Sequence, residues 1–305
     1  MRSGIPFRSI LSAVTISALQ CTGSGGTPAA PAFPVAPAVC TPTQRAFGGP
    51  VVDPHGPYYH QVVVARTSDG TTLTEAHQVL DHASVPDGVR RADGSVLIYY
   101  VNGAAGSVWV ARLEGDSARA LGAISINGVE APAGVVDPDA LLLADGTVRL
   151  SYLSGFGPPG PSAERAICIA DSQDGVTFTA RGAALSLTTG EMITDPSIVR
   201  LSDGTWLMAV SLGQQAIIAR SSDGLTFSRE TTLSFGGVPE LSRGEGGGVR
   251  LYVCAQGIVS YHSPDAGRTW SREGVVVGPG FNGHPIVCDP SLVGGAGLFV
   301  FKTGE

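Results

Sequence analysis

One stretch decides the fold: Asp195-Pro-Ser-Ile-Val-Arg-Leu-Ser-Asp-Gly-Thr-Trp-Leu-Met-Ala-Val210. Two short apolar runs flank an Asp-Gly pair, which predicts two β-strands joined by a tight turn. The chain continues through a third run at Ala216–Arg220 and a second Asp-Gly turn into a fourth run, Ser228–Phe235. The stretch therefore predicts a unit of four short antiparallel strands.

The opening of this unit recurs along the chain, with its proline at five positions. These are Pro86, Pro138, Pro196, Pro239 and Pro290, at spacings of 52, 58, 43 and 51 residues. Four-stranded units of this length are typical of propeller blades. The sequence therefore predicts an all-β fold, a five-bladed β-propeller.

The two ends of the chain complete each other. After Pro290, only two strands fit before Glu305. Two further apolar runs, Tyr59–Arg66 and Thr74–Leu80, precede the first opening and can supply the missing outer pair. Such a closure removes exposed sheet edges. We predict a propeller over residues 59–305, whose last blade is closed by N-terminal strands.

Charge narrows the range of partners. The 305 residues include 26 acidic and 19 basic side chains, for a formal charge of -7, and Lys302 is the only lysine. A nucleic-acid-binding surface needs clustered Lys and Arg, and no such run occurs. We expect no nucleic-acid partner, and we expect a monomer.

Residues 1–21 predict an export signal. Arg2 and Arg8 precede the run Ile10–Leu19, which is too short to span a membrane but suits a secretory signal. Cys21 follows directly and resembles the lipidated cysteine of bacterial lipoproteins. Gln20, however, stands where that motif has a small residue. Lipidation and plain secretion both stay open, so we expect a secreted or cell-envelope protein with no membrane contact except a lipid anchor.

Residues 22–58 are rich in Gly, Pro and Ala and predict a flexible tether and lead-in. Four cysteines remain beyond Cys21, and four cysteines allow three disulfide pairings. They are Cys40, Cys168, Cys254 and Cys288. The last two lie on successive blades, where a disulfide and two buried thiols are both plausible.

A second signature lies between the third and fourth strands. Ser263-Pro-Asp-Ala-Gly-Arg-Thr-Trp270 resembles the Asp box of sialidase-type (BNR) repeats, and Ser172–Phe178 and Ser221–Phe227 are shortened versions. In such turns the Ser and Asp side chains bind backbone amides, and Gly supplies a positive φ. The boxes therefore mark blades and predict no chemistry.

Acidic residues concentrate beside the repeated prolines. The ten positions that flank the five prolines are expected to face the axis, because alternate residues of a strand share a face. Six of them are Asp87, Asp137, Asp139, Asp195, Glu240 and Asp289. Convergent carboxyl groups repel, so some pKa values rise while others stay low, which is the split that a glycosidase uses. The alternative is that Asp before Pro only caps a turn.

The openings and the Asp-Gly turns over 59–305 resemble the five-bladed glycosidase clan of arabinanases, β-xylosidases and invertases. That clan carries catalytic carboxylates in the order Asp, Asp, Glu. The resemblance implies Asp87 as base or nucleophile, Asp195 as the orienting and pKa-tuning residue, and Glu240 as acid.

The sequence departs from the clan's pattern at two of these positions. The clan's first Asp precedes a proline, whereas Asp87 follows one, with Val85 in the usual place. Glu240 also follows its proline. The three groups are then expected at two heights in the channel. Asp137, Asp139 and Asp289 are substrate-binding candidates, and the first two are possible substitutes in catalysis.

Other residues complete the expected site. Phe156 and Phe281 are candidates for a sugar platform, and their alternative is simple exposure in loops. No cofactor is required. A structural cation such as calcium at the axis, with His284 as a ligand, is the weaker expectation beside an ordinary loop histidine.

The sequence predicts an exported glycoside hydrolase-like propeller that cleaves a polysaccharide or oligosaccharide by paired-carboxylate chemistry. One alternative is a non-catalytic carbohydrate- or protein-binding propeller. Another is an exo-sialidase, which would need three arginines around the substrate carboxylate. Three arginines lie four residues after a repeated proline: Arg90, Arg200 and Arg243. This spacing places them on the strand face opposite to the acidic residues, so we expect them to pack between blades or to lie at the rim.

Overall fold

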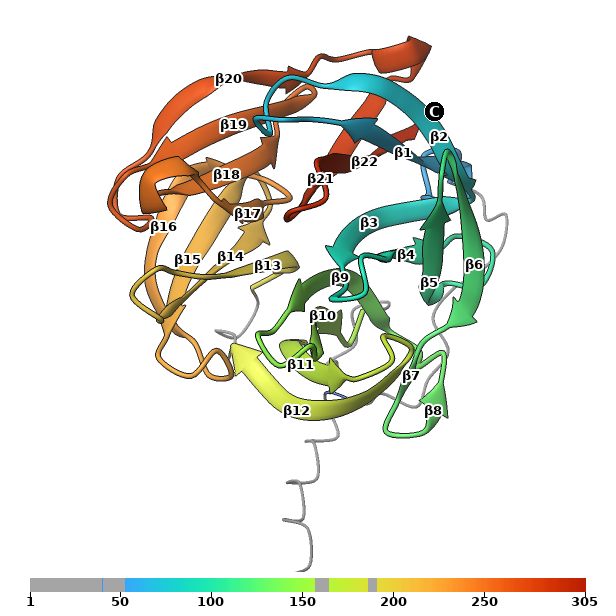
Figure 1. The fold of residues 1–305 in the computed structure, drawn as a ribbon, viewed down its shortest axis with the longest axis horizontal. Helices are drawn as coiled ribbons and strands as arrows, with labels where there is room; N and C mark the ends of the chain where they lie inside the picture. Colours follow the sequence, from blue (N-terminus) through green and yellow to red (C-terminus); the bar gives the residue numbers. More distant parts are fainter. Residues whose placement is uncertain (1–39, 41–52, 157–164, 186–190) are drawn as a thin grey trace, which may run out of the picture. The chain divides into compact units, whose positions relative to one another are not determined.

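The structure is a computed structural model that describes residue 40 and residues 53–156, 165–185 and 191–305 (Figure 1). The predicted signal at 1–21, including Cys21, lies outside the described residues, as does most of the predicted tether at 22–58. The helical segments described are three-residue 3-10 turns, and none of them could span a membrane.

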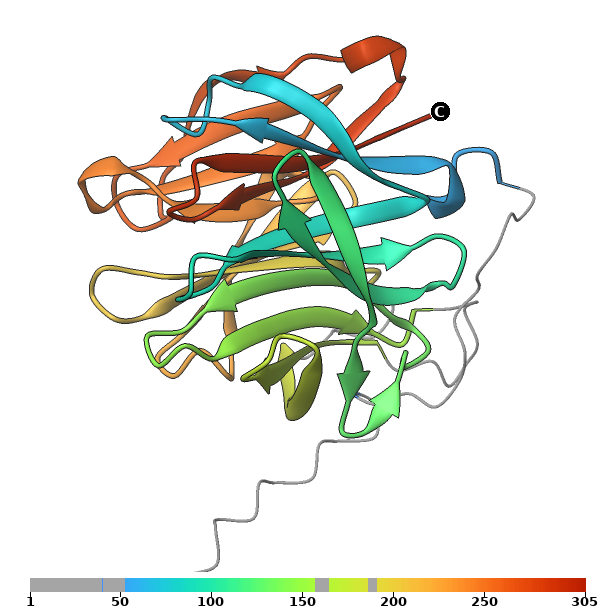
Figure 2. The same ribbon diagram turned by 45° about the vertical axis from the view of Figure 1, so that its right-hand side comes forward.

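Five sheets, each built on four antiparallel strands, form the blades of a β-propeller, as the repeat predicts (Figures 1 and 2). Blade 1 contains β3 (Ala83–Arg90), β4 (Val96–Asn102), β5 (Ser107–Glu114) and β6 (Ser117–Ala123). Blade 2 contains β9 (Val135–Leu142), β10 (Val148–Ser154), β11 (Ala166–Ser172) and β12 (Thr177–Leu185). Blade 3 contains β13 (Thr194–Arg200), β14 (Trp206–Leu212), β15 (Gln215–Ser221) and β16 (Ser228–Gly236). Blade 4 contains β17 (Glu240–Arg243), β18 (Val249–Cys254), β19 (Ile258–Ser263) and β20 (Ser271–Val277).

Blade 5 is closed by strands from both ends of the chain, which confirms the predicted closure. Its order is β2 (Thr74–Asp81), β1 (His60–Arg66), β22 (Leu298–Gly304) and β21 (Ile286–Val293). The antiparallel register of β1 and β22 pairs Val62 with Lys302 and Val64 with Val300. Closure therefore brings the chain's single lysine beside the N-terminal strand.

Blade 2 carries an addition that the repeat does not predict. The hairpin of β7 (Ser125–Ile126) and β8 (Val129–Glu130) extends this sheet to six strands. β7 pairs parallel with β12, and the Ala180 amide donates to Asn127 Oδ1 at 2.9 Å. The segment between blades 1 and 2 thus adds a short edge to the outer side of blade 2.

The hydrophobic core lies between neighbouring blades. One cluster combines Tyr99 and Val110 of blade 1 with Leu150, Cys168 and Phe178 of blade 2, all of them at most 1% exposed. Buried β-branched and aromatic residues suit strands covered on both faces. This packing fixes the five innermost strands, β3, β9, β13, β17 and β21, around the axis (Figure 1).

The predicted Asp-box turns have the expected local hydrogen bonds. At the fullest of them, Asp265 Oδ1 accepts the Thr269 amide at 2.8 Å, and Ser263 Oγ accepts the Gly267 amide at 2.7 Å. The turns at Asp174 and Asp223 repeat the pattern. Their kinship with sialidase-type repeats stays a prediction.

Two disulfides settle the cysteine pairing among the three possibilities. Cys254 pairs with Cys288, which joins blades 4 and 5, and Cys40 pairs with Cys168 across 128 residues of sequence. Cys40 is fully buried, and Tyr152 Oη donates to its carbonyl at 2.7 Å. Residue 40, inside the predicted tether, is therefore anchored to blade 2.

Candidate functional site: two carboxylate layers in the channel

A backbone bulge at each blade opening shapes the channel. The residue before every repeated proline has a left-handed φ: Val85 47°, Asp137 53°, Asp195 48°, Val238 49° and Asp289 49°. Strand pairing shifts register at four of the five openings. Positive φ is costly for residues with a side chain, most of all for β-branched valine. Because the valines adopt it too, the fold imposes this conformation, and it separates the side chains before and after each proline into two layers.

The layer after the prolines is a closed ring of hydrogen bonds between blades, here called the axial ring. Its members are Asp87, Asp139, Ser197, Glu240 and Ser291. Each side chain accepts a hydrogen bond from a backbone amide of the next blade. The donors and acceptors, in that order, are Ala140 and Asp87 at 2.6 Å, Ile198 and Asp139 at 3.1 Å, Leu241 and Ser197 at 2.9 Å, Leu292 and Glu240 at 3.3 Å, and Gly88 and Ser291 at 3.0 Å. One side chain per blade thus links it to its neighbour all the way round the axis.

The three carboxyl groups of the axial ring are crowded and buried. Oxygens of Asp87, Asp139 and Glu240 lie within 4.8 Å of one another. Burial raises the pKa of Asp87 to about 7. Burial, reinforced by the neighbouring ring carboxylates, raises the pKa values of Asp139 and Glu240 well above their usual range. The protonated forms are therefore favoured near neutral pH.

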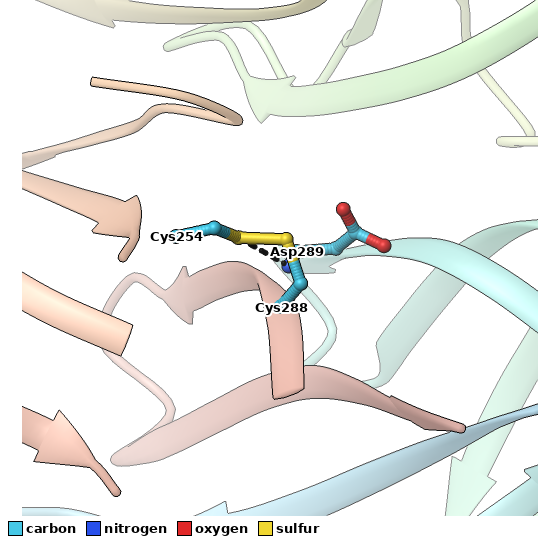
Figure 3. Close-up of side chains that lie close together, drawn as sticks. All are labelled: Cys254, Cys288 and Asp289. Carbon is cyan, nitrogen blue, oxygen red and sulfur yellow. Dashed lines mark hydrogen bonds between the residues drawn. A yellow bond between two sulfur atoms is a disulfide. The ribbon is translucent and has the colours of Figure 1, made fainter. Parts of the chain in front are cut away.

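The acidic residues before the prolines, Asp137, Asp195 and Asp289, form a second group together with Lys302 of β22. This group is here called the opening cluster. The Asp195 amide donates to Asp137 Oδ2 at 3.3 Å, and Lys302 Nζ lies 2.6 Å from Asp289 Oδ2. Asp289 follows the Cys254–Cys288 disulfide, and its amide donates to Cys254 Sγ at 3.2 Å. Its carboxylate points away from the disulfide (Figure 3). The disulfide therefore fixes the backbone from which this carboxylate extends.

The carboxyl groups of the opening cluster differ in acidity. Burial, followed by the negative charges of Asp195 and Asp289, raises the pKa of Asp137 well above its usual range. Burial and the charge of Asp289 raise the pKa of Asp195 to about 6. The Lys302 ammonium lowers both pKa values. Near neutral pH, Asp137 is therefore the protonated member of this adjacent pair, and Asp195 is the more readily ionised one.

A cavity of about 350 Å³, here called the opening cavity, adjoins the opening cluster. Asp137 and Lys302 line it together with the aromatic rings of Tyr58 and Phe156. Phe156 is 45% exposed, and the Arg165 guanidinium lies 5.7 Å from the centre of its ring. The volume lies at the small end of the range for ligand pockets, and apolar walls with a few convergent polar groups are typical of such sites.

His60 forms part of the wall of this opening cavity. Its Nε2 lies 2.9 Å from the His55 carbonyl and therefore donates, which leaves Nδ1 to accept from Ser84 Oγ at 2.8 Å. Burial, with the adjacent Lys302 charge, lowers the pKa of His60 to about 4. His60 is therefore a neutral, fixed wall of the cavity at ordinary pH.

The structure separates the three residues predicted as catalytic. Asp195 lies in the opening cluster, whereas Asp87 and Glu240 lie in the axial ring with Asp139. The substrate-binding candidates Asp137 and Asp289 lie with Asp195. The acidic sequence positions therefore do meet in the channel, but in two groups.

The remaining predicted residues have unequal positions. Phe156 lines the opening cavity, whereas the ring of Phe281 packs edge-on against Phe301, 5.3 Å between centroids, in the core of blade 5. His284 belongs to neither of the two close groups of metal-ligating side chains found among the described residues. Sequence reasoning did not select Lys302 or His60 for the site. The available signal was that Lys302 is the only lysine in an acidic chain.

No family model matches the chain, and no curated protein matches it in sequence. Its fold is shared by solved structures. A protein of unknown function from Dyadobacter fermentans is 17% identical, with 85% of this chain and 87% of that chain covered and a TM-score of 0.58. An α-L-arabinofuranosidase from Clostridium thermocellum is 14% identical, with coverages of 72% and 80% and a TM-score of 0.54.

A third similar structure is an N-acetylgalactosamine deacetylase from F. plautii, in complex with blood group B trisaccharide. It is 15% identical, with 74% of this chain and 76% of that chain covered and a TM-score of 0.55. At these identities the likeness establishes the fold alone. The chain is a five-bladed propeller with structural neighbours among glycoside hydrolases.

Proposed function

We propose that the protein is an exported glycoside hydrolase whose reaction takes place at the opening cluster. The observation that carries this proposal is the pair Asp137 and Asp195, neighbouring acidic residues of unequal acidity, of which Asp137 lines a cavity with aromatic walls. Two carboxyl groups held in different protonation states are what glycosidic bond cleavage requires.

The two groups have distinct roles in this proposal. Asp137 is protonated near neutral pH, and it donates its proton to the glycosidic oxygen as the bond to the anomeric carbon breaks. Asp195 is partly exposed and ionises above about pH 6. It either removes a proton from the attacking water or attacks the anomeric carbon itself. Activity should therefore rise through pH 6 and fall where Asp137 ionises.

The other residues of the site hold this pair and the sugar. The negative charge of Asp289 raises both pKa values, and the ammonium of Lys302 limits the rise. Tyr58 stacks on His82 at 4.0 Å between ring centroids, which fixes one aromatic wall, and Phe156 supplies another. Aromatic faces bury the apolar face of a sugar ring. We therefore expect a carbohydrate ligand at this end of the channel.

A second candidate function is carbohydrate binding without catalysis. It is favoured by Val85 and Val238, which occupy in blades 1 and 4 the position that is Asp in blades 2, 3 and 5. The opening cluster then lacks acidic groups on two sides. A propeller of this kind would bind a sugar at the same cavity and leave it intact.

For the expected structural cation, we propose the axial ring as the binding place. Asp87, Asp139 and Glu240 present closely spaced oxygens of the kind calcium prefers. Calcium binding should raise the melting temperature of wild-type protein and not that of Asp139→Asn. Unchanged melting in calcium and in chelator would contradict this assignment.

The proposed hydrolysis is tested by a screen on arabinan, xylan, fructan and sialoside substrates. Asp137→Asn and Asp195→Asn should each lower turnover by ~10²–10⁴-fold, the usual contribution of a general acid or base. The exposed Glu114 at the end of β5, which pairs with Arg119, offers a matched control, Glu114→Gln, which should leave turnover unchanged. Wild-type turnover in both Asp variants would overturn the assignment. Binding of a glycan without cleavage would favour the second candidate.

A further inference from the structure

A second and larger cavity, about 1420 Å³, lies at the other end of the channel, where the innermost strands end. It is here called the far cavity. Five arginines line it: Arg90, Arg149, Arg200, Arg243 and Arg250. They come from blades 1 to 4, so the guanidinium groups surround the cavity. Such a concentration is unexpected in a chain with a formal charge of -7.

Three of these arginines have no acidic partner. Arg149 pairs with Asp171 at 2.9 Å, and Arg250 pairs with Glu273 at 2.7 Å. None of the ion pairs among the described residues involves Arg90, Arg200 or Arg243, and all three side chains are exposed. These three occupy the same place in blades 1, 3 and 4, four residues after the repeated proline.

Contacts with the neighbouring blade hold two of these arginines in place. Arg90 Nη1 donates to the Gly295 carbonyl at 2.8 Å, and Arg243 Nε donates to the Arg200 carbonyl at 3.0 Å. Each of these bonds uses one nitrogen of a guanidinium that offers five N–H donors. The side chain of Arg200 lies 5.7 Å from the ring of Trp206, a cation–π distance. The three groups are therefore positioned while donor capacity remains.

The acidic residues that line the far cavity form no ion pair with Arg90, Arg200 or Arg243 among the described residues. Asp69, Asp145 and Asp223 line it, but their carboxylates accept amides of their own turns. Asp139 and Glu240 close its inner end, where Asp139 accepts the Ile198 amide and Glu240 accepts the Leu292 amide and the Ser197 hydroxyl. The guanidinium groups of Arg90, Arg200 and Arg243 are therefore the ones left to meet an anionic ligand, because Asp171 and Glu273 hold Arg149 and Arg250.

We propose that the far cavity binds a small ligand that carries several carboxylate groups. Guanidinium forks match carboxylates with two parallel hydrogen bonds, and such charge-assisted bonds are strong. The cavity is larger than most single-ligand pockets and can admit a short oligomer. The net negative charge of the chain disfavours a long polyanion at a distance but not a small one inside the cavity. Both short acidic oligosaccharides and free polycarboxylic acids have this chemistry.

The test is calorimetric titration of the full chain with trigalacturonate, citrate and the neutral sugar maltotriose. We expect trigalacturonate or citrate to bind, maltotriose to fail, and affinity to fall as salt is added. Arg90→Ala, Arg200→Ala and Arg243→Ala should each weaken binding about tenfold or more, the effect of one lost hydrogen bond to a charged group. Because all three side chains are exposed, these variants should fold.

Two controls separate this site from other effects. Arg119→Ala, an exposed arginine on β6, should bind as the wild type does. Asp137→Asn should also keep full affinity, so that failure of the proposed hydrolysis leaves this test intact. Binding of trigalacturonate alone would identify an acidic glycan, and binding of citrate alone a free acid. Absence of binding by both acids, or wild-type affinity in all three arginine variants, would overturn the proposal.

Discussion

Two aspartates on one strand, Asp137 and Asp139, lie two residues apart and belong to different parts of the molecule. Both are buried, and burial raises both pKa values. Asp139 accepts the Ile198 amide and the Ser151 hydroxyl, as a link between blades. Asp137 faces the opening cavity beside Lys302. The axial ring is thus a structural use of acidic residues, and the opening cluster is a candidate chemical one.

The comparison shows that a raised pKa does not by itself identify a functional carboxyl group. Structural networks shift pKa values as strongly as active sites do. The opening cluster is distinguished by a buried cation, Lys302, beside its carboxyl groups, whereas each carboxyl group of the axial ring links two blades through a backbone amide.

The largest effect is expected at the ion pair of the opening cluster. Lys302→Met leaves Asp289 buried without its cation, which should lower the free energy of unfolding by about 3–5 kcal/mol. Chemical denaturation measures this change. The double variant Lys302→Met/Asp289→Asn should recover most of the loss, because no unpaired charge remains. A double variant as unstable as the single one would show that packing, not charge, dominates at this position.

A smaller loss is expected in the axial ring. Ser197 Oγ donates to Glu240 at 2.8 Å and accepts the Leu241 amide. Ser197→Ala leaves a buried amide and a buried carboxyl group without their partner, which should cost about 1–3 kcal/mol of unfolding free energy. Ser107 is a matched control, since its buried hydroxyl has no hydrogen-bond partner among the residues that the structure describes. Ser107→Ala should be neutral, and equal losses in the two variants would argue against a special role for the ring.

The sequence was sufficient for the blades but not for the two layers. The repeated prolines and Asp-Gly turns are local signals, so they predict strand order, blade number and closure. Regular alternation places Asp137 and Asp139 on one face. The left-handed residue before Pro138 breaks that alternation, and no sequence rule predicts it, because proline disfavours helical values in its predecessor and says nothing of positive φ.

Long-range contacts account for what else was missed. Lys302 reaches the opening cluster only because β22 lies between β1 and β21 after closure. Cys40 and Cys168 are 128 residues apart, and spacing cannot pair them. The hairpin of β7 and β8 has a local signal in its Asn127-Gly128 turn, but its parallel pairing with β12 is a long-range contact.

The axial ring should also make the stability of the protein depend on pH. The pKa of Asp87 is about 7 in the fold and near 4 in an unfolded chain. Between these values the folded state holds a proton that the unfolded state has lost, so stability falls as pH rises. The slope should be on the order of 1 kcal/mol per pH unit. Asp87→Asn should reduce the slope by about this amount and leave the contributions of Asp139 and Glu240 in place, and an unchanged slope would show that the proton is held elsewhere.

The most direct test of two separate layers compares Asp137→Asn with Asp139→Asn, by melting temperature and by sugar binding or turnover per folded molecule. The account predicts that Asp137→Asn melts at or above the wild-type temperature and loses its action on the sugar. It predicts that Asp139→Asn melts lower and keeps that action. The reverse pattern, with function lost at Asp139 and stability lost at Asp137, would contradict the assignment of chemistry to the opening cluster.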